Sequence, residues 1–324
     1  MLRQTRRETC FTQDDPYEEF RSAVWAGLSA PRKHIAPKFF YDARGSRLFE
    51  RICSTKEYYP TITETAILSA HITAIAAMLP RDAVLVEFGS GASLKVRLLL
   101  DALYRPAAYV PIDISDEHLL DAARALARDY LRLPIFPLHA DFTRSFALPT
   151  DLPRGPRIGF FPGSTIGNFH PHEAITILRG FSRQLGSNGR LLIGVDRKKD
   201  SAILQAAYND RSGFTAAFNL NLLARINREL GGTFALDAFE HNAFYNAAAS
   251  RIEMHLVSVQ AQTVSVCGRR FHFAEGESIH TENSYKYAPA EFRAVAHEAG
   301  FRSIAEWTDP QGLFSVHLLG IDRL

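Results

Sequence analysis

The segment 83–88 limits the possible folds of this chain more than any other feature of its sequence. It reads Ala-Val-Leu-Val-Glu-Phe, an almost continuous apolar run, and it ends in Gly89-Ser90-Gly91. Such a run is typical of a parallel strand that is buried on both faces, and a glycine turn lets the chain pass from this strand into a helix. The leucine pattern of residues 94–104 predicts that helix.

The same alternation of strand and helix recurs along the middle of the chain. We predict further strands at 109–113, 135–138, 158–161 and 191–196, and helices at 116–131 and 171–185. Strands that alternate with helices require right-handed crossovers, so this part is predicted to be an α/β fold with a doubly wound parallel sheet. Ligands of such sheets bind outside the carboxyl ends of the strands.

The character of the sequence changes after Asp196. Residues 201–230 are predicted to be helical up to Gly231-Gly232, and the residues around Met254 and His272 alternate apolar and polar side chains as antiparallel strands do. The first pattern then returns in a helix at 289–299 and strands at 304–307 and 314–319.

This change of pattern predicts two domains. The first consists of residues 61–197 and 288–324 and contains the parallel sheet. The second is an inserted α+β domain of residues 1–60 and 198–287.

The composition is that of a globular protein without a strongly charged surface. Lys and Arg number 37 against 35 Asp and Glu, and the net charge of +2 gives no broad electrostatic footprint for nucleic acid or anionic membranes. No apolar run approaches the roughly 20 residues of a membrane span, and residues 1–16 lack the apolar core of a signal peptide. We therefore expect a cytoplasmic protein that binds neither nucleic acid nor membranes.

The sequence predicts no metal site and no disulfide framework. Cys10, Cys53 and Cys267 are far apart in the chain, which disfavours both a disulfide framework and a zinc knuckle. The histidine pair in His170-Pro171-His172 surrounds a proline at a predicted helix start. We interpret this pair as part of the helix start rather than as metal ligands.

The glycine turn predicts the kind of ligand. A dinucleotide-binding turn has the pattern G-x-G-x-x-G, but Leu94 occupies the third glycine position, which disfavours NAD and favours S-adenosylmethionine. Asp113 follows the second strand and can accept hydrogen bonds from ribose hydroxyls, while Asp141-Phe142 follows the third strand and can hold an adenine. The alternative is that the glycines form only a tight turn and that Asp113 only caps a helix.

Two other enzyme classes are disfavoured by the residues after the fourth strand. Thr165 stands at the position where a nucleophile elbow has serine. Phe161-Pro162-Gly163-Ser164 replaces the Asn/Asp-Pro-Pro-aromatic motif that many methyltransferases of nucleic-acid bases carry there.

Longer motifs give the chain a specific resemblance. It resembles the ergothioneine-pathway histidine N-alpha-methyltransferases, which convert histidine into its trimethylated betaine, hercynine. The matching residues span nearly the whole chain and are Phe40-Tyr41-Asp42, Gly45-Ser46-Arg47-Leu48-Phe49, Glu57-Tyr58-Tyr59-Pro60-Thr61, Glu64, Glu87-Phe88-Gly89-Ser90-Gly91, Pro162-Gly163-Ser164-Thr165-Ile166-Gly167-Asn168-Phe169, Tyr208-Asn209-Asp210 and His280-Thr281-Glu282-Asn283-Ser284-Tyr285-Lys286-Tyr287. The resemblance implies a Rossmann-like, class I S-adenosylmethionine-dependent methyltransferase sheet and an inserted domain that binds the substrate.

The resemblance also implies site residues. The cofactor site of the family falls on Gly89, Lys95, Asp113, Asp141 and Phe142. The amino-acid site falls on Tyr58, Gly163, Asn168, Tyr208, Glu282 and Ser284, with Tyr41, Thr215, Phe218 and Met254 as supporting walls. Tyr41 and Tyr58 are the candidates for orienting the substrate amine and passing on its proton.

Simpler interpretations of some residues remain open. Tyr58, Tyr59 and Tyr208 also fit a hydrophobic core with satisfied hydroxyls, Glu282 also fits an exposed strand edge, and Asn168 also fits a helix cap. Two further functions remain as alternatives: the same chemistry on another amino acid, such as a tryptophan derivative, and a non-catalytic module that only binds ligands. We expect a monomer whose partner is a small amino acid, L-histidine.

Overall fold

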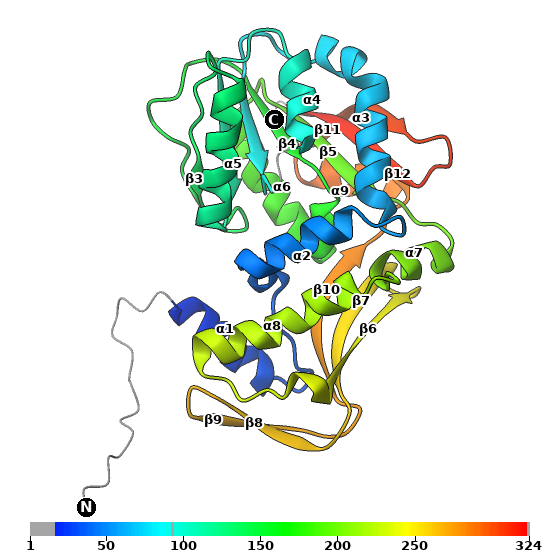
Figure 1. The fold of residues 1–324 in the computed structure, drawn as a ribbon. Helices are drawn as coiled ribbons and strands as arrows, with labels where there is room; N and C mark the ends of the chain where they lie inside the picture. The colour runs from blue at the N-terminus through cyan, green and yellow to red at the C-terminus, as the bar shows by residue number, and fades with distance from the viewer. Residues whose placement is uncertain (1–16, 92–93, 323–324) are drawn as a thin grey trace, which may run out of the picture.

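The computed structural model of the protein describes residues 17–91 and 94–322 (Figure 1). One lobe contains a seven-stranded sheet in the order β11-β12-β5-β4-β1-β2-β3. Its strands are β1 (Val84–Phe88), β2 (Ala108–Asp113), β3 (Leu138–His139), β4 (Arg157–Phe161), β5 (Arg190–Asp196), β11 (Phe301–Thr308) and β12 (Phe314–Ile321). This order confirms the α/β fold that the alternation of strands and helices predicts.

The sheet is mixed rather than wholly parallel, which corrects the prediction. Strand β12 pairs antiparallel with both β5 and β11, while the pairs from β5 to β3 are parallel. The turn Asp309–Gly312 accounts for the change of direction, because it joins β11 directly to β12 as a hairpin. Strand β3 is shorter than predicted, since Pro137 has no N–H to donate to a neighbouring strand.

Helices cover both faces of this sheet. On one face, α3 (Tyr59–Ala77) and α4 (Leu94–Ala102) bury side chains such as Leu68 and Leu99 against Leu85 and Phe160. On the other face, α6 (Pro171–Leu185) and α9 (Pro289–Glu298) bury Phe181 and Phe292 against the sheet. Helix α5 (Asp116–Asp129) follows β2. Successive side chains of each strand point to opposite faces of the sheet, so the strands contribute to two separate hydrophobic cores.

The predicted helix at 171–185 is confirmed at both ends. Pro171 is its first residue, and the His170 N–H, one position earlier, donates to Glu173 Oε2 at 2.8 Å. The helix ends before Gly186, whose φ of 75° suits glycine. His170-Pro171-His172 is therefore a helix start, as expected.

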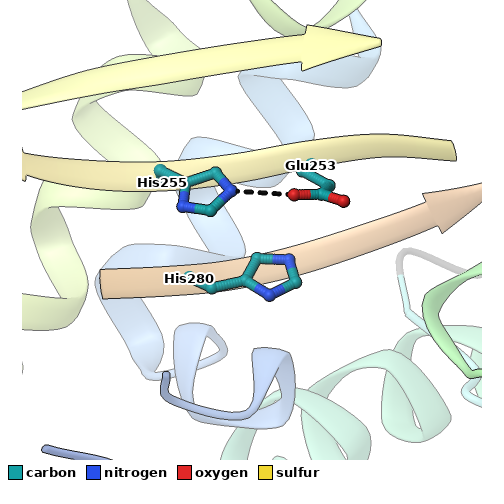
Figure 2. A group of neighbouring side chains, drawn as sticks. All are labelled: Glu253, His255 and His280. Atoms are coloured by element: carbon teal, nitrogen blue, oxygen red, sulfur yellow. Dashed lines mark hydrogen bonds and ion pairs between the residues drawn. The ribbon is translucent and has the colours of Figure 1, made fainter. Parts of the chain in front are cut away.

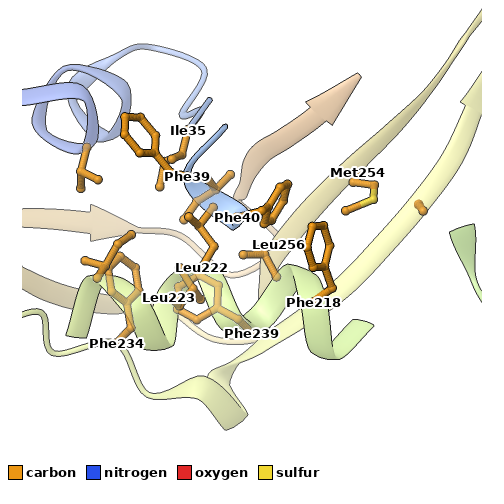
Figure 3. Close-up of a cluster of buried hydrophobic side chains, with 14 of the residues drawn as sticks. Ile35, Phe39, Phe40, Phe218, Leu222, Leu223, Phe234, Phe239, Met254 and Leu256 are labelled. Carbon is orange, nitrogen blue, oxygen red and sulfur yellow. The ribbon is translucent and has the colours of Figure 1, made fainter. Parts of the chain in front are cut away.

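The second lobe is built from the N-terminal part of the chain and the residues between β5 and α9. Its helices are α1 (Glu18–Ser29), η1 (Pro37–Phe40), α2 (Ala43–Cys53), α7 (Ser201–Tyr208), α8 (Phe214–Leu230) and η3 (Leu236–Ala238). Its strands β6 (Phe239–Asn246), β7 (Arg251–Ser258) and β10 (Ser278–Tyr285) form an antiparallel sheet in the order β10-β7-β6, and β8 (Gln262–Val266) pairs with β9 (Arg269–Phe273). Figure 3 shows its core, in which Phe40 and Phe218 pack beside Met254 and Leu256.

The long helix predicted at 201–230 is two helices. The chain leaves the helical path at Asn209–Gly213, and the Asp210 carboxylate accepts hydrogen bonds from the backbone N–H groups of Phe214 and Thr215, at 3.0 and 2.8 Å. These bonds cap α8 and compete with a continuous helix at this point. Gly213, with a φ of 72°, makes the turn between the helices.

The two lobes meet along several contacts. Helix α2 lies between them in Figure 1, and η2 (Thr165–Asn168), which follows β4, contacts β10 of the second lobe. Arg197 and Tyr287 also form an isolated β-bridge, at the points where the chain leaves the first lobe after β5 and returns to it before α9. In the part of the chain that the structure describes, no helix has the length and apolar character needed to cross a membrane. The predictions on residues 1–16, including Cys10, lie outside the described residues.

Candidate active site

A cavity of about 1490 Å³ lies between the lobes, at the carboxyl ends of the parallel strands. Binding cavities for one small molecule commonly measure about 300–1,000 Å³, so this one has room for a cofactor and a substrate together. Ten of the candidate residues line it: Tyr41, Tyr58, Gly89, Lys95, Asp113, Asp141, Phe142, Gly163, Asn168 and Glu282. Residues more than 200 positions apart in the sequence thus share one cavity.

The glycine turn opens the cavity at the end of β1. Gly89 has a φ of 73°, and its N–H donates to the Ile112 carbonyl at 2.8 Å, which holds the turn against β2. Asp113 Oδ2 accepts from the Gly91 N–H at 3.3 Å, and its Oδ1 accepts from the Ser115 N–H at 2.9 Å. Asp113 therefore stabilises the turn and also presents its carboxylate to the cavity.

The residues of the glycine turn fit a nucleoside cofactor. The Ser90 hydroxyl lines the cavity and is buried, and it has no hydrogen-bond partner among residues 17–91 and 94–322. A Cβ on Gly89 would lie 3.5 Å from the Phe142 ring, so glycine leaves the space beside that ring open. An unpartnered hydroxyl, a carboxylate and an aromatic ring around one open space are the groups that a ribose and an adenine require.

Asp141 already has a cationic partner from the other lobe. Lys38 of η1 donates to Asp141 Oδ2 at 2.8 Å, and the Thr143 hydroxyl and N–H donate to Oδ1. Although burial alone would raise the pKa of Asp141, these bonds hold it below its ordinary value. Lys38 is 103 residues away in the sequence, so no local pattern could have indicated this ion pair.

Two tyrosines form the wall contributed by the second lobe. The Tyr41 ring packs edge-on against Phe49 and Phe218, and Tyr58 packs edge-on against Tyr208. Burial raises the pKa of both Tyr41 and Tyr58 well above the ordinary value, and the nearby Glu282 adds to the effect. Both side chains therefore stay neutral phenols at physiological pH.

Glu282 is half-buried in the cavity wall rather than exposed at a strand edge. The pairing between β7 and β10 shifts register between His280 and Glu282, and this bulge breaks the regular alternation of β10. Burial raises the pKa of Glu282 to about 7, and Lys286 opposes the rise. A carboxyl group whose pKa lies near 7 inside a cavity is a strong candidate for contact with a polar ligand.

Five candidate residues lie behind the cavity wall: Tyr208, Thr215, Phe218, Met254 and Ser284. Tyr208 and Ser284 belong to a buried polar network, in which the Tyr208 hydroxyl donates to Ser284 Oγ at 2.7 Å. The Lys286 ammonium donates to Ser284 Oγ at 2.8 Å and to Asp196 at 2.7 Å. The other three support the wall through packing or through the cap of α8.

The simpler interpretations of Tyr59 and Asn168 have different outcomes. Tyr59 is a buried aromatic whose hydroxyl donates to Asp196 at 2.7 Å and accepts from Lys199 at 2.6 Å, as expected for a satisfied core tyrosine. Asn168 does not cap α6, because His170 occupies the N-cap position. Asn168 ends η2 and lines the cavity.

The structure also brings together Glu253, His255 and His280, which the sequence did not single out as a group (Figure 2). The two imidazoles stack with 4.7 Å between ring centroids, and His255 Nε2 lies 3.1 Å from Glu253 Oε2. Arg251 pairs with the other Glu253 oxygen at 2.7 Å, and His280 Nε2 donates to the Glu282 carbonyl at 3.0 Å. These bonds make the cluster a polar section of the cavity wall next to Glu282.

Glu64 is another functional candidate that sequence reasoning did not assign. It lies in α3, and its Oε2 accepts from the Gly163 N–H at 2.8 Å and pairs with the Lys95 ammonium. The sequence placed Glu64 in a motif but gave no sign that its carboxylate is buried against two cavity residues.

The sheet order and the glycine turn define the class I methyltransferase fold. A profile of the family described as "Histidine-specific methyltransferase, SAM-dependent" matches residues 20–321. The chain belongs to this family.

Individual relatives are similar over most of the chain. Histidine N-alpha-methyltransferase of Mycolicibacterium smegmatis is 42% identical over 94% of this chain and 96% of its own length. Ergothioneine biosynthesis protein 1 of Neurospora crassa is 33% identical over 94% of this chain, which spans only 35% of that longer protein. The 4-dimethylallyltryptophan N-methyltransferase of Aspergillus fumigatus is 27% identical over 89% of both chains.

The solved structures show weaker likeness. Magnesium protoporphyrin IX methyltransferase from Synechocystis, with bound S-adenosylhomocysteine, is 12% identical over 88% of this chain and 97% of its own, with a TM-score of 0.47.

Proposed function

We propose that the protein transfers methyl groups from S-adenosylmethionine to the α-amino nitrogen of L-histidine and forms the trimethylated betaine hercynine, a step of ergothioneine biosynthesis. The observation that carries this proposal is the half-buried Glu282 carboxyl in a cavity that the glycine turn also lines. The family membership and the similarity to the Mycolicibacterium smegmatis histidine N-alpha-methyltransferase support it.

In this proposal the cofactor lies along the ends of the parallel strands. Gly89 leaves room for it, Asp113 accepts from its ribose hydroxyls, and Asp141 and Phe142 contact its adenine. Lys95 donates a hydrogen bond to its carboxylate. The bound sulfonium supplies an activated methyl group, so the protein contributes alignment and exclusion of water.

Histidine occupies the part of the cavity beside the second lobe. Glu282 accepts a hydrogen bond from the imidazole N–H, and Ser284 and Tyr208, which lie behind the cavity wall, support this end of the site. Tyr58 and Asn168 hold the α-amino and carboxylate groups. Gly163 has no side chain, which leaves space for an amine that grows by three methyl groups.

The substrate amine must be neutral to attack a methyl group, but a peptide α-amino group has a pKa of about 8 and that of a free amino acid is higher, so protonation competes at neutral pH. Tyr41 and Tyr58 stay protonated because burial raises the pKa of each phenol. Each phenol oxygen can accept a hydrogen bond from the amine, and this orients the nitrogen lone pair. We assign them this orienting role and a relay of the amine proton, in which a phenol oxygen accepts that proton while its own hydroxyl proton passes to water.

We also propose a division of labour between the lobes. Residues 61–197 and 288–324 act as the S-adenosylmethionine-binding domain, and residues 1–60 and 198–287 act as the substrate-binding domain. The separate hydrophobic cores support this division. The scattered cysteines support a cytoplasmic location. We also propose a monomer, which light scattering on the purified protein would check.

A mass-spectrometric screen of the twenty amino acids with S-adenosylmethionine tests the function. We expect histidine to gain one, two and three methyl groups and the other amino acids to gain none. A tryptophan derivative is the second candidate, because the 4-dimethylallyltryptophan N-methyltransferase is similar over 89% of the chain. Methylation of 4-dimethylallyltryptophan in preference to histidine would overturn the histidine assignment.

A further inference from the structure

Glu64 lies at the point where three parts of the cavity wall meet. Only 1% of its surface is exposed, and its Oε2 accepts from the Gly163 N–H at 2.8 Å and pairs with the Lys95 ammonium. Lys95 belongs to α4, after β1, while Gly163 belongs to the loop after β4, and both residues line the cavity. One buried carboxylate therefore connects the ends of two adjacent strands.

The helix that carries Glu64 also carries substrate-side residues. Helix α3 begins at Tyr59, directly after Tyr58, and its Thr61 lines the cavity one turn before Glu64. The bonds of Glu64 thus fix the start of α3, and with it Tyr58, relative to Lys95 and Gly163. This arrangement links the tyrosine wall to the glycine turn.

The large sheet leaves space for the carboxylate. A Cβ on Gly194 of β5 would lie 1.9 Å from Glu64 Oε1, so any side chain at this position would displace Glu64. The absence of a side chain at the centre of a buried strand weakens the strand, which is consistent with a close approach by another group. Here that group is the Glu64 carboxylate.

Charge gives this contact a chemical role. The Lys95 side chain is 14% exposed and its ammonium lies beside the cavity, where an unpaired positive charge would repel a sulfonium. The Glu64 carboxylate makes the pair neutral overall. It also leaves the remaining donor capacity of the ammonium for a ligand carboxylate, since an ammonium has three donors.

We propose that Glu64 is a positioning residue of the methyl-transfer site, which holds Lys95 and the Gly163 backbone in place and balances the Lys95 charge against the sulfonium of S-adenosylmethionine. This inference rests on the proposed function, because that function places the cofactor beside Lys95.

The test compares two ligands that differ in charge at sulfur. S-adenosylmethionine is a sulfonium cation, whereas S-adenosylhomocysteine is a neutral thioether with the same nucleoside and amino-acid ends. Glu64→Gln keeps the shape and can accept from the Gly163 N–H, but it removes the negative charge. By calorimetry we expect the Kd of S-adenosylmethionine to rise about tenfold more than the Kd of S-adenosylhomocysteine.

A purely structural role gives a different result. A local loss of shape weakens both ligands by the same factor, and an equal loss in Glu64→Gln would overturn the charge-balancing role. Glu298→Gln, an exposed charge on α9, is the matched control and should leave both Kd values unchanged.

Two further variants keep the test decisive. Glu64→Asp keeps the negative charge beside Lys95, so its preference between the two ligands should stay close to that of the original protein even if Glu64→Gln folds poorly. In a Lys95→Met background, Glu64→Gln should have little further effect on that preference, because Glu64 acts through Lys95. If Glu64→Gln changes the ligand preference by the same factor with and without Lys95→Met, the inference is contradicted.

The proposed function and this inference fail in different ways. If the original protein binds neither ligand, the proposed function is wrong. If it binds both and Glu64→Gln binds them with unchanged preference, only the role of Glu64 is wrong.

Discussion

The Lys286 ammonium lies 2.7 Å from the Asp196 carboxylate, and both side chains are fully buried. Burial alone would lower the pKa of Lys286, but Asp196 and the Tyr208 hydroxyl keep the ammonium charged, with a pKa above its ordinary value. Because Ser284 Oγ accepts from both Lys286 and Tyr208, its own hydrogen is left to donate elsewhere. The buried ion pair thus orients a hydroxyl at the histidine end of the proposed site.

Lys286→Met should destabilise the protein because it leaves Asp196 with fewer cationic partners. Breaking a buried ion pair commonly costs about 3–5 kcal/mol, and we expect the lower end because Lys199 still lies 2.5 Å from Asp196. Urea unfolding measures the effect. Lys198→Met breaks an exposed pair with Glu291 and should cost about 1 kcal/mol or less, so equal losses in the two variants would contradict this account.

Asp113→Ala should weaken cofactor binding. Loss of the charge-assisted bonds that we propose to the ribose hydroxyls should cost roughly 1.5–3 kcal/mol, or about 10–150-fold in affinity. Calorimetry with S-adenosylhomocysteine measures this change. Asp121→Ala on the outer surface of α5 is the control, and its affinity should be that of the original protein. Unchanged binding by a folded Asp113→Ala variant would remove Asp113 from the cofactor site.

Local sequence patterns predicted the large sheet well because they reflect local physical constraints. Glycine permits the positive φ that the turn at 89–91 requires, proline fixes φ at residue 171, and the strands and helices next to them are confirmed. The break between α7 and α8 was missed because the residues on both sides of it have a helical pattern. Only the capping bonds of Asp210 interrupt the helix there. The antiparallel β12 was missed because period-two patterns do not give strand direction.

The buried charges of the site could not be predicted in the same way. Glu64, Lys286 and Lys38 each find a partner at least 31 residues away, and an isolated charged residue in a sequence reads as a surface residue. The motif resemblance identified ten of the residues that line the cavity, but it did not show that Tyr208 and Ser284 lie behind the wall, hydrogen-bonded to Lys286.

The stability of the ligand-free protein should depend on pH through Glu282. Burial raises its pKa from the ordinary 4.5 to about 7, so the folded protein binds this proton more tightly than the unfolded chain does. The contribution of Glu282 is therefore fully favourable below pH 4.5, decreases as the pH rises to about 7, and is constant above that value. The total decrease is on the order of 3 kcal/mol.

Glu282→Gln should remove this dependence because an amide does not titrate. Free energies of unfolding, measured in urea at several pH values, should decrease for the original protein relative to the variant as the pH rises through this window. Glu240→Gln, an exposed position on β6, should follow the original protein at every pH. A difference between Glu282→Gln and the original protein that is independent of pH would show that Glu282 is already ionised across this range.

Glu282→Ala should also change which amino acid the enzyme prefers. Histidine differs from other amino acids by two ring nitrogens, at least one of which carries a proton, and the half-buried Glu282 can accept a hydrogen bond from that N–H. A site built around a polar group rejects ligands that lack its partner strongly, because its own polar groups are then left unpaired. The variant should lose on the order of 2–3 kcal/mol toward histidine, or about 30–150-fold in kcat/KM, and little toward phenylalanine or tryptophan.

Methyl transfer from labelled cofactor to each amino acid measures these values, with Glu240→Ala as the control. An equal loss toward every amino acid would make Glu282 a structural residue, and unchanged histidine turnover would exclude it from imidazole recognition.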